Sequence, residues 1–462
     1  MFRHVKTFSV GLFALAIFSA SCSGAEPTQP IEQTSPTDTQ PAQGATDTPP
    51  QTGPLATAAA LFGQITLNPP TPPGGVEVNG PDDYVGLFQQ GWNIVNDNYV
   101  RDNFNGVDWD GVYDTYLPRF ESVSNQQSHW DLMSNLISEL RDQHSRFVAP
   151  NELQNEFNLG NSIPLAQSNA ATGIQIWPGP GKEDEVLAIW NVCSDSPAAD
   201  AGVERGDVIL AINNATVVSP QSTYNFPASF GPPGSSVTLR VQGGETEQPR
   251  NVVLQYTPIS GCYDWRHEIV SESPRIGYIL APDFDGDAAH ELFTRIQEME
   301  GDGDLDGLIV DVRHNPGGNS DESSGVFAEG IVGTEGPLRE GEQRTIYRIR
   351  GPVEWNTTTP LVILTDGSSH SASEYFAAGL VELDRAVTVG MNTAGNTEGI
   401  VGFILSDGSL IRLAITTFLL NDGTGFEGVG VPPAIEIPLG EWGLAQKPYD
   451  AQLQAAIDYL SQ

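Results

Sequence analysis

Lysine is almost absent from this sequence. Among its 462 residues, the only lysines are Lys6, Lys182 and Lys447. Lysine and arginine together number 21, against 59 aspartates and glutamates, which gives a formal net charge of −38. Phosphate backbones bind basic surfaces, so this balance excludes nucleic acid as a partner. Any chemistry that needs an amine is limited to three positions.

Cysteine is scarce as well. Cys22, Cys193 and Cys262 are the only three, and no cysteine–histidine spacing suits a zinc site. The acidic stretch at 301–307 has Arg313 where a calcium-binding EF-hand loop requires a glutamate. We expect neither a metal nor another cofactor. Cys193 and Cys262 are either a disulfide or two buried thiols.

Long apolar runs are missing too, and the N-terminus comes closest to one. Arg3 and Lys6 precede an apolar run from Phe8 to Phe18, which is too short to span a bilayer and is followed by small residues. This pattern predicts a signal peptide at 1–22 and an exported, extracytoplasmic protein in which a disulfide is permitted. The residues before Cys22 resemble a bacterial lipobox, which implies lipidation of Cys22 and a lipid anchor as the only membrane attachment. Plain signal cleavage is the alternative.

Composition divides the rest of the chain into five segments. Proline, threonine and glutamine dominate the first, which predicts a disordered tether. In the second, Leu132, Met133, Leu136, Ile137 and Leu140 form an apolar helical stripe just before His144. The expected segments are a tether at 23–80, a helical part at 81–160, a β domain at 161–258, an α/β core at 259–440 and a C-terminal helix at 441–462.

The third segment consists of short β-type runs separated by turns. Its stretch SDSPAADAGVERGDVILAINN, residues 194–214, resembles the PDZ domain. The resemblance implies that Thr172, Gly173, Ile174 and Gln175 form the loop that grips a peptide's terminal carboxylate while the peptide adds a strand. A small β domain without a ligand is the alternative.

The core alternates strands with helices. Strands are expected at GLIVDVR (307–313) and PLVILTD (360–366), and helices at 288–299 and at about 374–383. Such alternation predicts an α/β layer, and functional groups gather at its strand ends.

One such strand end carries several serines. In LTDGSSHSASEYFAAG, residues 364–379, Ser371 lies at the strand-to-helix turn, where the first helical N–H groups favour a developing oxyanion. Ser373 is the expected N-cap. Two glycines, Gly317 and Gly318, end the preceding strand and would allow close backbone approach.

These two segments together resemble the C-terminal processing (tail-specific) peptidase family. The residues are DVRHNPGG (311–318) and SHSASEYFAAGLVELDRAVTVGMNTAG, and the likeness extends over roughly 84 to 440. It implies an α/β, mixed-sheet catalytic core with an N-terminal helical segment and an inserted PDZ-like domain. It also implies that Ser371 is the nucleophile and that the N–H of Ala372, with that of Gly317 or Gly318, forms the oxyanion hole.

The sequence departs from the family's Ser–Lys branch. Asn396 follows Gly395 where that branch has its lysine, and an amide does not accept a proton near neutral pH. The tricorn-like branch uses a histidine and a glutamate instead. LRDQHSRF and GFEGVGVPPAIEI resemble its two segments and imply His144 as base and Glu427 as its support, with Gln143 where that branch has a serine.

We therefore expect a serine endopeptidase, a hydrolase that forms an acyl-enzyme on Ser371 with His144 as base. Its partners would be polypeptides bound by their C-termini. Activity should rise with pH as His144 loses its proton. His370, adjacent to Ser371, and His314 are weaker candidates for the base. A catalytically silent binding protein or a PDZ adaptor is the alternative class.

Overall fold

A computed structural model describes residues 73–153, 170–177, 187–193, 195–217, 228–243, 247–259, 265–318, 322–351, 357–438 and 450–462. The predicted signal peptide, the lipidation site Cys22, most of the tether, Cys262 and all three lysines lie outside these residues. Within the described part, no helix is both long and apolar enough to cross a membrane.

The first described segment is helical. After two short 3-10 helices, η1 (Pro73–Gly75) and η2 (Phe104–Gly106), its elements are α2 (Tyr84–Asn98), α3 (Trp109–Glu121) and α4 (Gln126–Ser138). Asp83, Asp108 and Asn125 cap these three helices by accepting an early helical N–H. The stripe predicted on α4 is confirmed: Met133, Leu136, Ile137 and Leu140 are buried.

The β domain is built around one antiparallel sheet. Its strands are β3 (Ile174–Trp177), β4 (Leu187–Val192), β5 (Val208–Ile212), β8 (Ser236–Gln242) and β9 (Arg250–Gln255), in the order β3-β4-β5-β8-β9. The smaller elements are β6 (Ala215–Thr216) beside β5, the pair β2 (Ala170–Ala171) and β7 (Phe230–Gly231), and helix α7 (Pro197–Asp200). Strand β3 therefore ends this path, and no described strand pairs with its outer edge.

The core has a six-stranded mixed sheet. Its order is β10 (Arg266–Glu272), β11 (Arg275–Leu280), β12 (Gly307–Asp311), β15 (Leu361–Thr365), β16 (Ala386–Gly390) and β19 (Ile435–Glu436). All neighbours are parallel except β10 and β11.

Helices cover both faces of this sheet. Leu308 and Val310 pack with residues of α8 (Ala288–Glu300) and α9 (Ala372–Glu382), and the intervening Ile309 packs with α10 (Ala451–Leu460). The alternation follows the two-residue period of a strand. Parallel strands with covered faces are the α/β layer that the sequence predicts.

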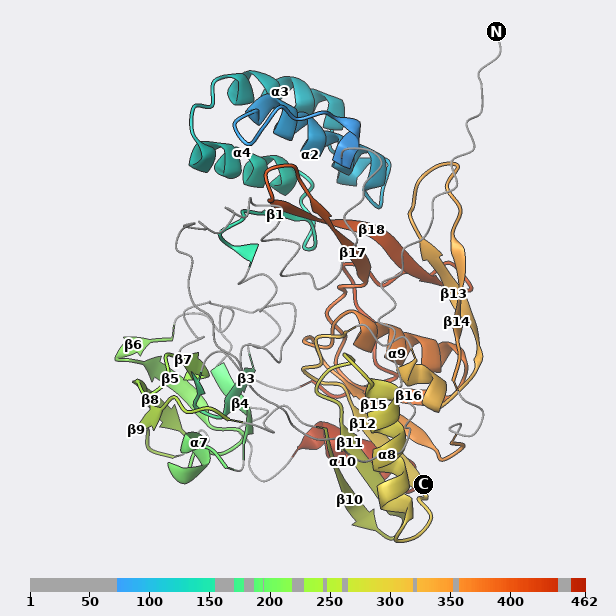
Figure 1. Cartoon of the computed structure of the whole chain (residues 1–462). Coiled ribbons are helices and arrows are strands. Elements are labelled where there is room, and N and C mark those ends of the chain that lie inside the picture. Colours follow the sequence, from blue (N-terminus) through green and yellow to red (C-terminus); the bar gives the residue numbers. More distant parts are fainter. Residues whose placement is uncertain are drawn as a thin grey trace, which may run out of the picture. The chain divides into compact units, whose positions relative to one another are not determined.

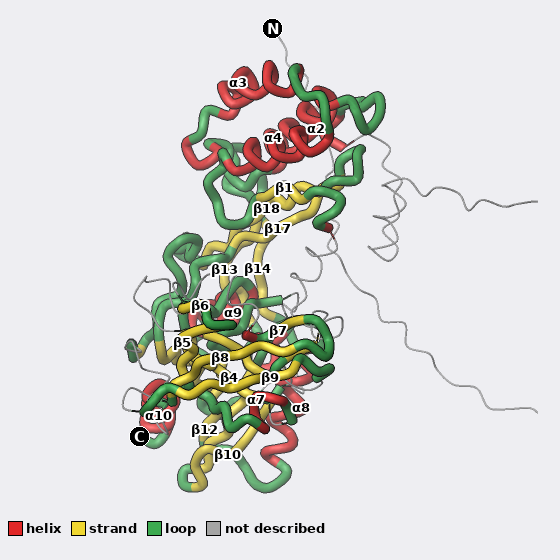
Figure 2. The backbone as a smooth tube through the Cα atoms, turned by 90° about the vertical axis from the view of Figure 1, so that its left-hand side faces the viewer, coloured by secondary structure: helices red, strands yellow, loops and turns green. Residues whose placement is uncertain are grey.

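A second sheet joins the helical segment to the core. Its strands are β1 (Arg146–Val148), β13 (Gly330–Gly336), β14 (Thr345–Ile349), β17 (Glu398–Ile404) and β18 (Leu410–Leu420), and a 3-10 helix, η4 (Ser323–Val326), precedes β13. β18 pairs with β1, β13 and β17. Figures 1 and 2 show β1, β17 and β18 together beside α2 and α4, with which they share a hydrophobic core. The start of β1 and the start of β17 thus both lie beside β18, although about 250 residues separate them in the sequence.

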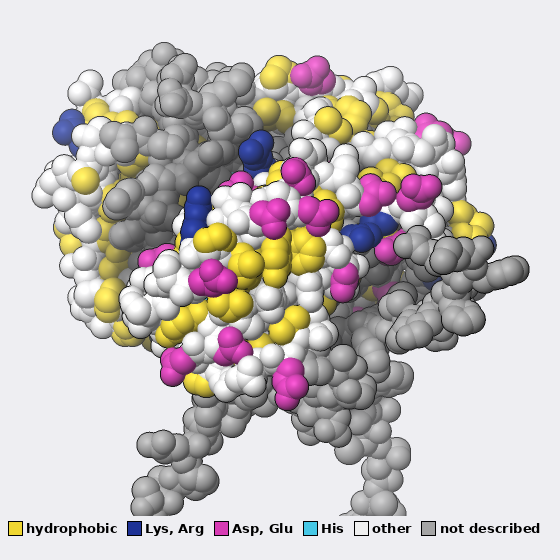
Figure 3. Space-filling model, turned by 90° about the horizontal axis from the view of Figure 1, so that it is seen from above, with side chains coloured by type: hydrophobic (Ala, Val, Ile, Leu, Met, Phe, Trp, Pro, Cys, Tyr) yellow, Lys and Arg dark blue, Asp and Glu magenta, His cyan; other side chains and the backbone are white. Residues whose placement is uncertain are grey.

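The structure also bears on the cysteines and on the charge of the sequence. Cys193 is disulfide-bonded, and the other predicted member, Cys262, lies outside the described residues. On the face drawn in Figure 3, carboxylate side chains outnumber cationic ones, in keeping with the charge balance of the sequence.

Candidate active site

Ser371 lies at the turn between β15 and α9. It is the N-cap of α9, with φ 52° and ψ −118°, and it is half-buried. A serine rarely adopts a positive φ, and such strained backbone is concentrated at functional sites. The expectation that Ser373 caps the helix is wrong: Ser373 lies inside α9, and its hydroxyl donates to the carbonyls of Asn315 and His370.

The glycine loop after β12 lies against this turn. A Cβ on Gly317 would come within 2.8 Å of both the Ala372 nitrogen and the Ser371 Cβ, and Gly317 has φ 91°. The N–H of His370 donates to the carbonyl of Asn315 at 2.9 Å. Only glycine allows this approach of the two segments.

Two backbone donors remain for an oxyanion. The N–H of Gly317 donates to Asn315 Oδ1 at 2.8 Å, so it is already engaged. Among the described residues, the N–H groups of Gly318 and Ala372 donate to no acceptor. Of the two glycines that the sequence left open, Gly318 is therefore the better partner for Ala372.

A buried ionic cluster fixes the strand that leads to this loop. Arg313 is 1% exposed and contacts Asp311 at 2.6 Å and Asp450 at 2.9 Å. The hydroxyl of Tyr278 also donates to Asp311. The cluster joins the end of β12 to the start of α10.

Glu374 connects the turn at Ser371 to the segment before β17 by hydrogen bonds. Its buried carboxylate accepts hydrogen bonds from the N–H groups of Ser371, Gly395 and Asn396 at 3.0, 2.7 and 2.8 Å, and from the Thr393 hydroxyl at 2.5 Å. The carbonyl of Asn396 also accepts from the Ser371 N–H. Asn396, at the position of the dyad lysine, thus contacts the nucleophile through its main chain.

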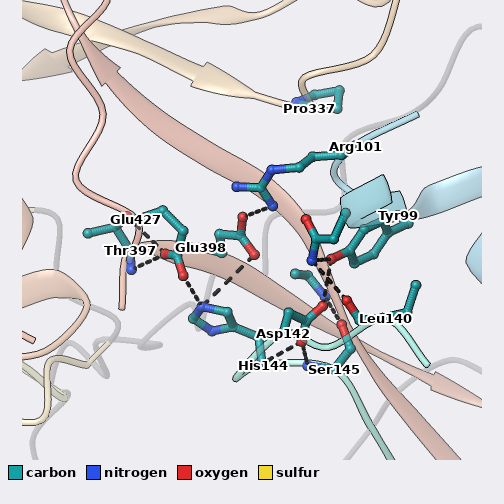
Figure 4. Close-up of polar contacts among 12 residues, drawn as sticks. Tyr99, Arg101, Leu140, Asp142, His144, Ser145, Pro337, Thr397, Glu398 and Glu427 are labelled. Atoms are coloured by element: carbon teal, nitrogen blue, oxygen red, sulfur yellow. Dashed lines mark hydrogen bonds and ion pairs between the residues drawn. The ribbon is translucent and has the colours of Figure 1, made fainter. Parts of the chain in front are cut away.

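His144 lies in the loop between α4 and β1 and is 4% exposed. Its Nε2 lies 2.9 Å from Glu427 Oε1, across 283 residues of sequence. The N–H and hydroxyl of Thr397 donate to the other oxygen of Glu427 at 2.7 and 3.1 Å (Figure 4). Burial raises the pKa of Glu427, but these contacts with His144 and Thr397 outweigh it and leave the pKa lowered.

Asp142 holds the backbone of His144. Its Oδ1 accepts the N–H groups of His144 and Ser145 at 2.9 and 2.5 Å, and its Oδ2 accepts the hydroxyl of Tyr99. Gln143, which stands where the tricorn-like branch has a serine, is exposed. In this chain the neighbouring Asp142, rather than residue 143, holds the backbone of His144.

A second carboxylate also faces the imidazole. Glu398, the first residue of β17, is 3% exposed, and its Oε2 lies 3.9 Å from His144 Nε2. Its Oε1 is ion-paired with Arg101. Burial lowers the pKa of His144, but Glu427, Glu398 and Asp142 together outweigh burial and leave the pKa raised.

The same three side chains are the group that could hold a metal among the described residues. The ligand atoms of His144, Glu398 and Glu427 lie within 4.8 Å of one another. The guanidinium of Arg101 already neutralises Glu398, and a cation would have to displace the contact between His144 and Glu427. We therefore assign the group to proton chemistry.

Ser371 and His144 are joined indirectly. The Ser371 N–H bonds to Asn396, the next residue Thr397 bonds to Glu427, and Glu427 bonds to His144. No hydrogen bond links Ser371 to His144 directly among the described residues. Because Nε2 is engaged with Glu427, Nδ1 is the nitrogen left for the serine.

Family comparisons agree with this layout. Residues 275–437 match the family model for peptidase family S41, 81–138 match the tricorn protease C1 domain, and 189–243 match the PDZ domain. The chain is a serine peptidase, similar to family S41 over residues 275–437. The matched segments include Ser371 and Glu427, whereas His144 follows the C1 match by six residues.

Individual curated proteases are similar to most of this chain. The carboxyl-terminal-processing protease of Synechocystis sp. is 26% identical over 389 residues, covering 81% of this chain and 86% of that protein. Tricorn protease homolog 1 of Streptomyces coelicolor is 28% identical over 369 residues, covering 76% of this chain but only 33% of that protein.

Solved structures confirm the predicted fold class. The photosystem II D1 C-terminal processing protease superposes with a TM-score of 0.58 at 21% identity, covering 82% of this chain and 97% of that one. Mature CPAF superposes with a TM-score of 0.51 at 12% identity, over 82% and 97%. The peptidase therefore has the expected mixed α/β fold with N-terminal helices and a PDZ domain.

The other histidines near the peptidase turn have separate contacts. His370 Nδ1 lies 2.7 Å from the carbonyl of Ser368, within the same turn. The ring of His314 lies 5.3 Å from that of Trp190 in the PDZ domain.

The predicted peptide-binding loop of the PDZ domain is firmly built. Thr172 is buried, and its hydroxyl donates to the carbonyl of Ala228 at 2.7 Å. Gly173 has φ 89°, and a Cβ there would lie 2.2 Å from Ser196 Oγ. Ile174 and Gln175 then open the edge strand β3. A peptide added to this edge would begin at the turn that Gly173 makes.

Proposed function

We propose that this peptidase is an exported endopeptidase that cleaves polypeptides recruited by their C-termini. Ser371 is the nucleophile, His144 the base and Glu427 the group that orients the base. The observation that carries the proposal is the hydrogen bond between His144 and Glu427, which joins a histidine and a carboxylate from distant segments. Glu427 is in turn held by Thr397, the residue after the Asn396 whose carbonyl accepts the Ser371 N–H.

The reaction follows from these positions. Ser371 Oγ attacks the carbonyl carbon of the scissile peptide while its proton passes to His144, and the N–H groups of Gly318 and Ala372 bind the oxyanion. His144 returns the proton to the leaving amine, and the C–N bond breaks to give an acyl-enzyme. Water then attacks the ester by the same route and releases Ser371.

Recruitment by the C-terminus has a direct test. Replacing the terminal carboxylate of a peptide substrate with an amide should lower kcat/KM by roughly 10- to 100-fold, mainly through KM, because charge-assisted hydrogen bonds to the PDZ loop are lost. Steady-state kinetics on the matched peptides measures this. Equal kcat/KM for both peptides would refute recruitment.

Two glycines of the PDZ domain provide matched variants. Gly173→Ala places a Cβ against Ser196 and should abolish the preference for the free carboxylate. Gly234→Ala also changes a glycine at positive φ, but its Cβ meets nothing within 4 Å, so this variant should keep the preference.

Export and anchoring are part of the same proposal, supported by the N-terminal sequence. Cells fed an alkyne-tagged fatty acid should label the wild-type protein, and Cys22→Ala should lose both the label and membrane association because the acylated thiol is gone. Retention of the label in Cys22→Ala would exclude this anchor.

A further inference from the structure

Glu398 is a buried carboxylate with unusual partners. It is 3% exposed, and no backbone N–H or hydroxyl group among the described residues donates to its oxygens. Its contacts are charges: Arg101 on one oxygen and the imidazole of His144 on the other, at 3.9 Å (Figure 4). A buried carboxylate is costly unless charged partners compensate it, so the position of Glu398 between Arg101 and His144 indicates a role at this place.

The arrangement places two carboxylates on one ring nitrogen. Glu427 lies 2.9 Å from His144 Nε2 and Glu398 lies 3.9 Å from the same atom. Glu427 supplies the hydrogen bond, so Glu398 acts on the imidazole by its charge alone. A charge at this distance in a buried site favours the imidazolium over the neutral ring.

We propose that Glu398 is a positioning residue that stabilises the imidazolium of His144 formed during proton transfer, with Arg101 holding it in place. The inference rests on the proposed role of His144 as base. Arg101 follows α2 and belongs to the N-terminal helical segment, while Glu398 begins β17. The ion pair thus couples the helical segment to the proposed base.

The charged groups around the pair are few. His144 is faced by Glu427 from the loop after β18, by Glu398 from β17 and by Asp142 from its own loop. Glu398 is faced by Arg101, Glu427 and His144, and Tyr99 faces both Asp142 and Glu398. Burial raises the pKa of Glu398, and Arg101 opposes that shift. Among the described residues, Arg101 and the imidazolium of His144 are thus the cations that favour the ionised form of Glu398.

Glu398→Gln separates this role from a structural one. Activity requires neutral His144, so kcat/KM falls as pH drops through the pKa of that ring. Removing the Glu398 charge lowers this pKa, and the acidic limb of the profile should move down by about 1 pH unit. The alkaline plateau should also fall by roughly 10-fold, because the imidazolium is less stabilised. A merely structural residue would lower the rate equally at every pH, and an unmoved limb would overturn the proposal.

Two further variants test the role given to Glu398. Arg101→Met removes the partner of Glu398, which then takes up a proton more readily, so the limb should move in the same direction; an upward shift would contradict the role given to Arg101. The control is Glu335→Gln on β13, a half-buried carboxylate that contacts Thr416 of β18 rather than His144, and its limb should stay in place.

Failure here is distinguishable from failure of the proposed function. If His144→Ala is inactive while Glu398→Gln leaves the limb unmoved, only the role of Glu398 is lost. If His144→Ala keeps wild-type turnover, the base itself is wrong. If Glu398→Gln does not fold, as judged by circular dichroism, the Arg101→Met profile decides the question.

Discussion

Ser371→Ala is expected to lower kcat for a peptide substrate by roughly 10⁴- to 10⁶-fold, the loss seen when an acyl-transfer enzyme is left without its nucleophile. The structure explains the size of the effect. The proposed attacking hydroxyl lies at a turn with φ 52°, beside the N–H groups of Ala372 and Gly318, which donate to no acceptor among the described residues.

The measurement combines turnover with covalent labelling. A fluorophosphonate probe should label the wild-type protein, and the label should disappear in Ser371→Ala. Ser368→Ala is the matched control, because Ser368 lies half-buried in the same turn. Among the described residues its hydrogen bonds are made by its backbone, from its N–H to Asp366 and from its carbonyl to His370. Labelling that survives in Ser371→Ala would assign the nucleophile to another residue.

Ser369 shows why the nearest serine is not a substitute. Its hydroxyl is buried and donates to the carbonyl of Val312 at 2.7 Å, so it joins the turn to the end of the β12 segment. Ser369→Ala should therefore reduce stability more than it affects labelling per folded molecule. The hydroxyls of Ser369 and Ser373 thus hold the turn together, which leaves Ser371 as the proposed attacking group.

Local sequence signals predicted the main elements well. The stripe on α4, the buried strand before the serines and the glycines after β12 each follow from a short-range pattern, and all are present. The start of α9 was misplaced, although the sequence holds the correct signal. Ser371 and Glu374 form the S-x-x-E pattern of a capping box, which identifies Ser371 as the N-cap and Glu374 as the residue that folds back on it.

The surroundings of His144 could not be found in this way. Asp142, Arg101 and Glu398 act through contacts between segments that meet only because β1 and β17 both pair with β18. Glu398 begins a strand and Arg101 follows a helix, and neither position has a local pattern that marks it as a partner of a histidine. Their roles depend on strand register, which a single sequence does not specify.

His144→Ala should reduce kcat as severely as Ser371→Ala, since a serine hydroxyl without a base is a poor nucleophile. The sharper expectation concerns the double variant. Groups that act as one unit have non-additive effects, so His144→Ala combined with Ser371→Ala should be no slower than either single variant. Two independent sites would instead multiply their losses.

Two histidine controls complete the test. His267→Ala, whose ring lies 3.7 Å from Glu298 on the exposed side of the core, should keep wild-type turnover. His370→Ala removes the competing candidate and should lower kcat by less than about 10-fold, because the hydrogen-bond partner of the His370 ring among the described residues is the carbonyl of Ser368. A loss in His370→Ala equal to that in Ser371→Ala, with His144→Ala still active, would move the base to His370. The contact between His144 and Glu427 would then be structural, and its loss should lower the melting temperature rather than the rate.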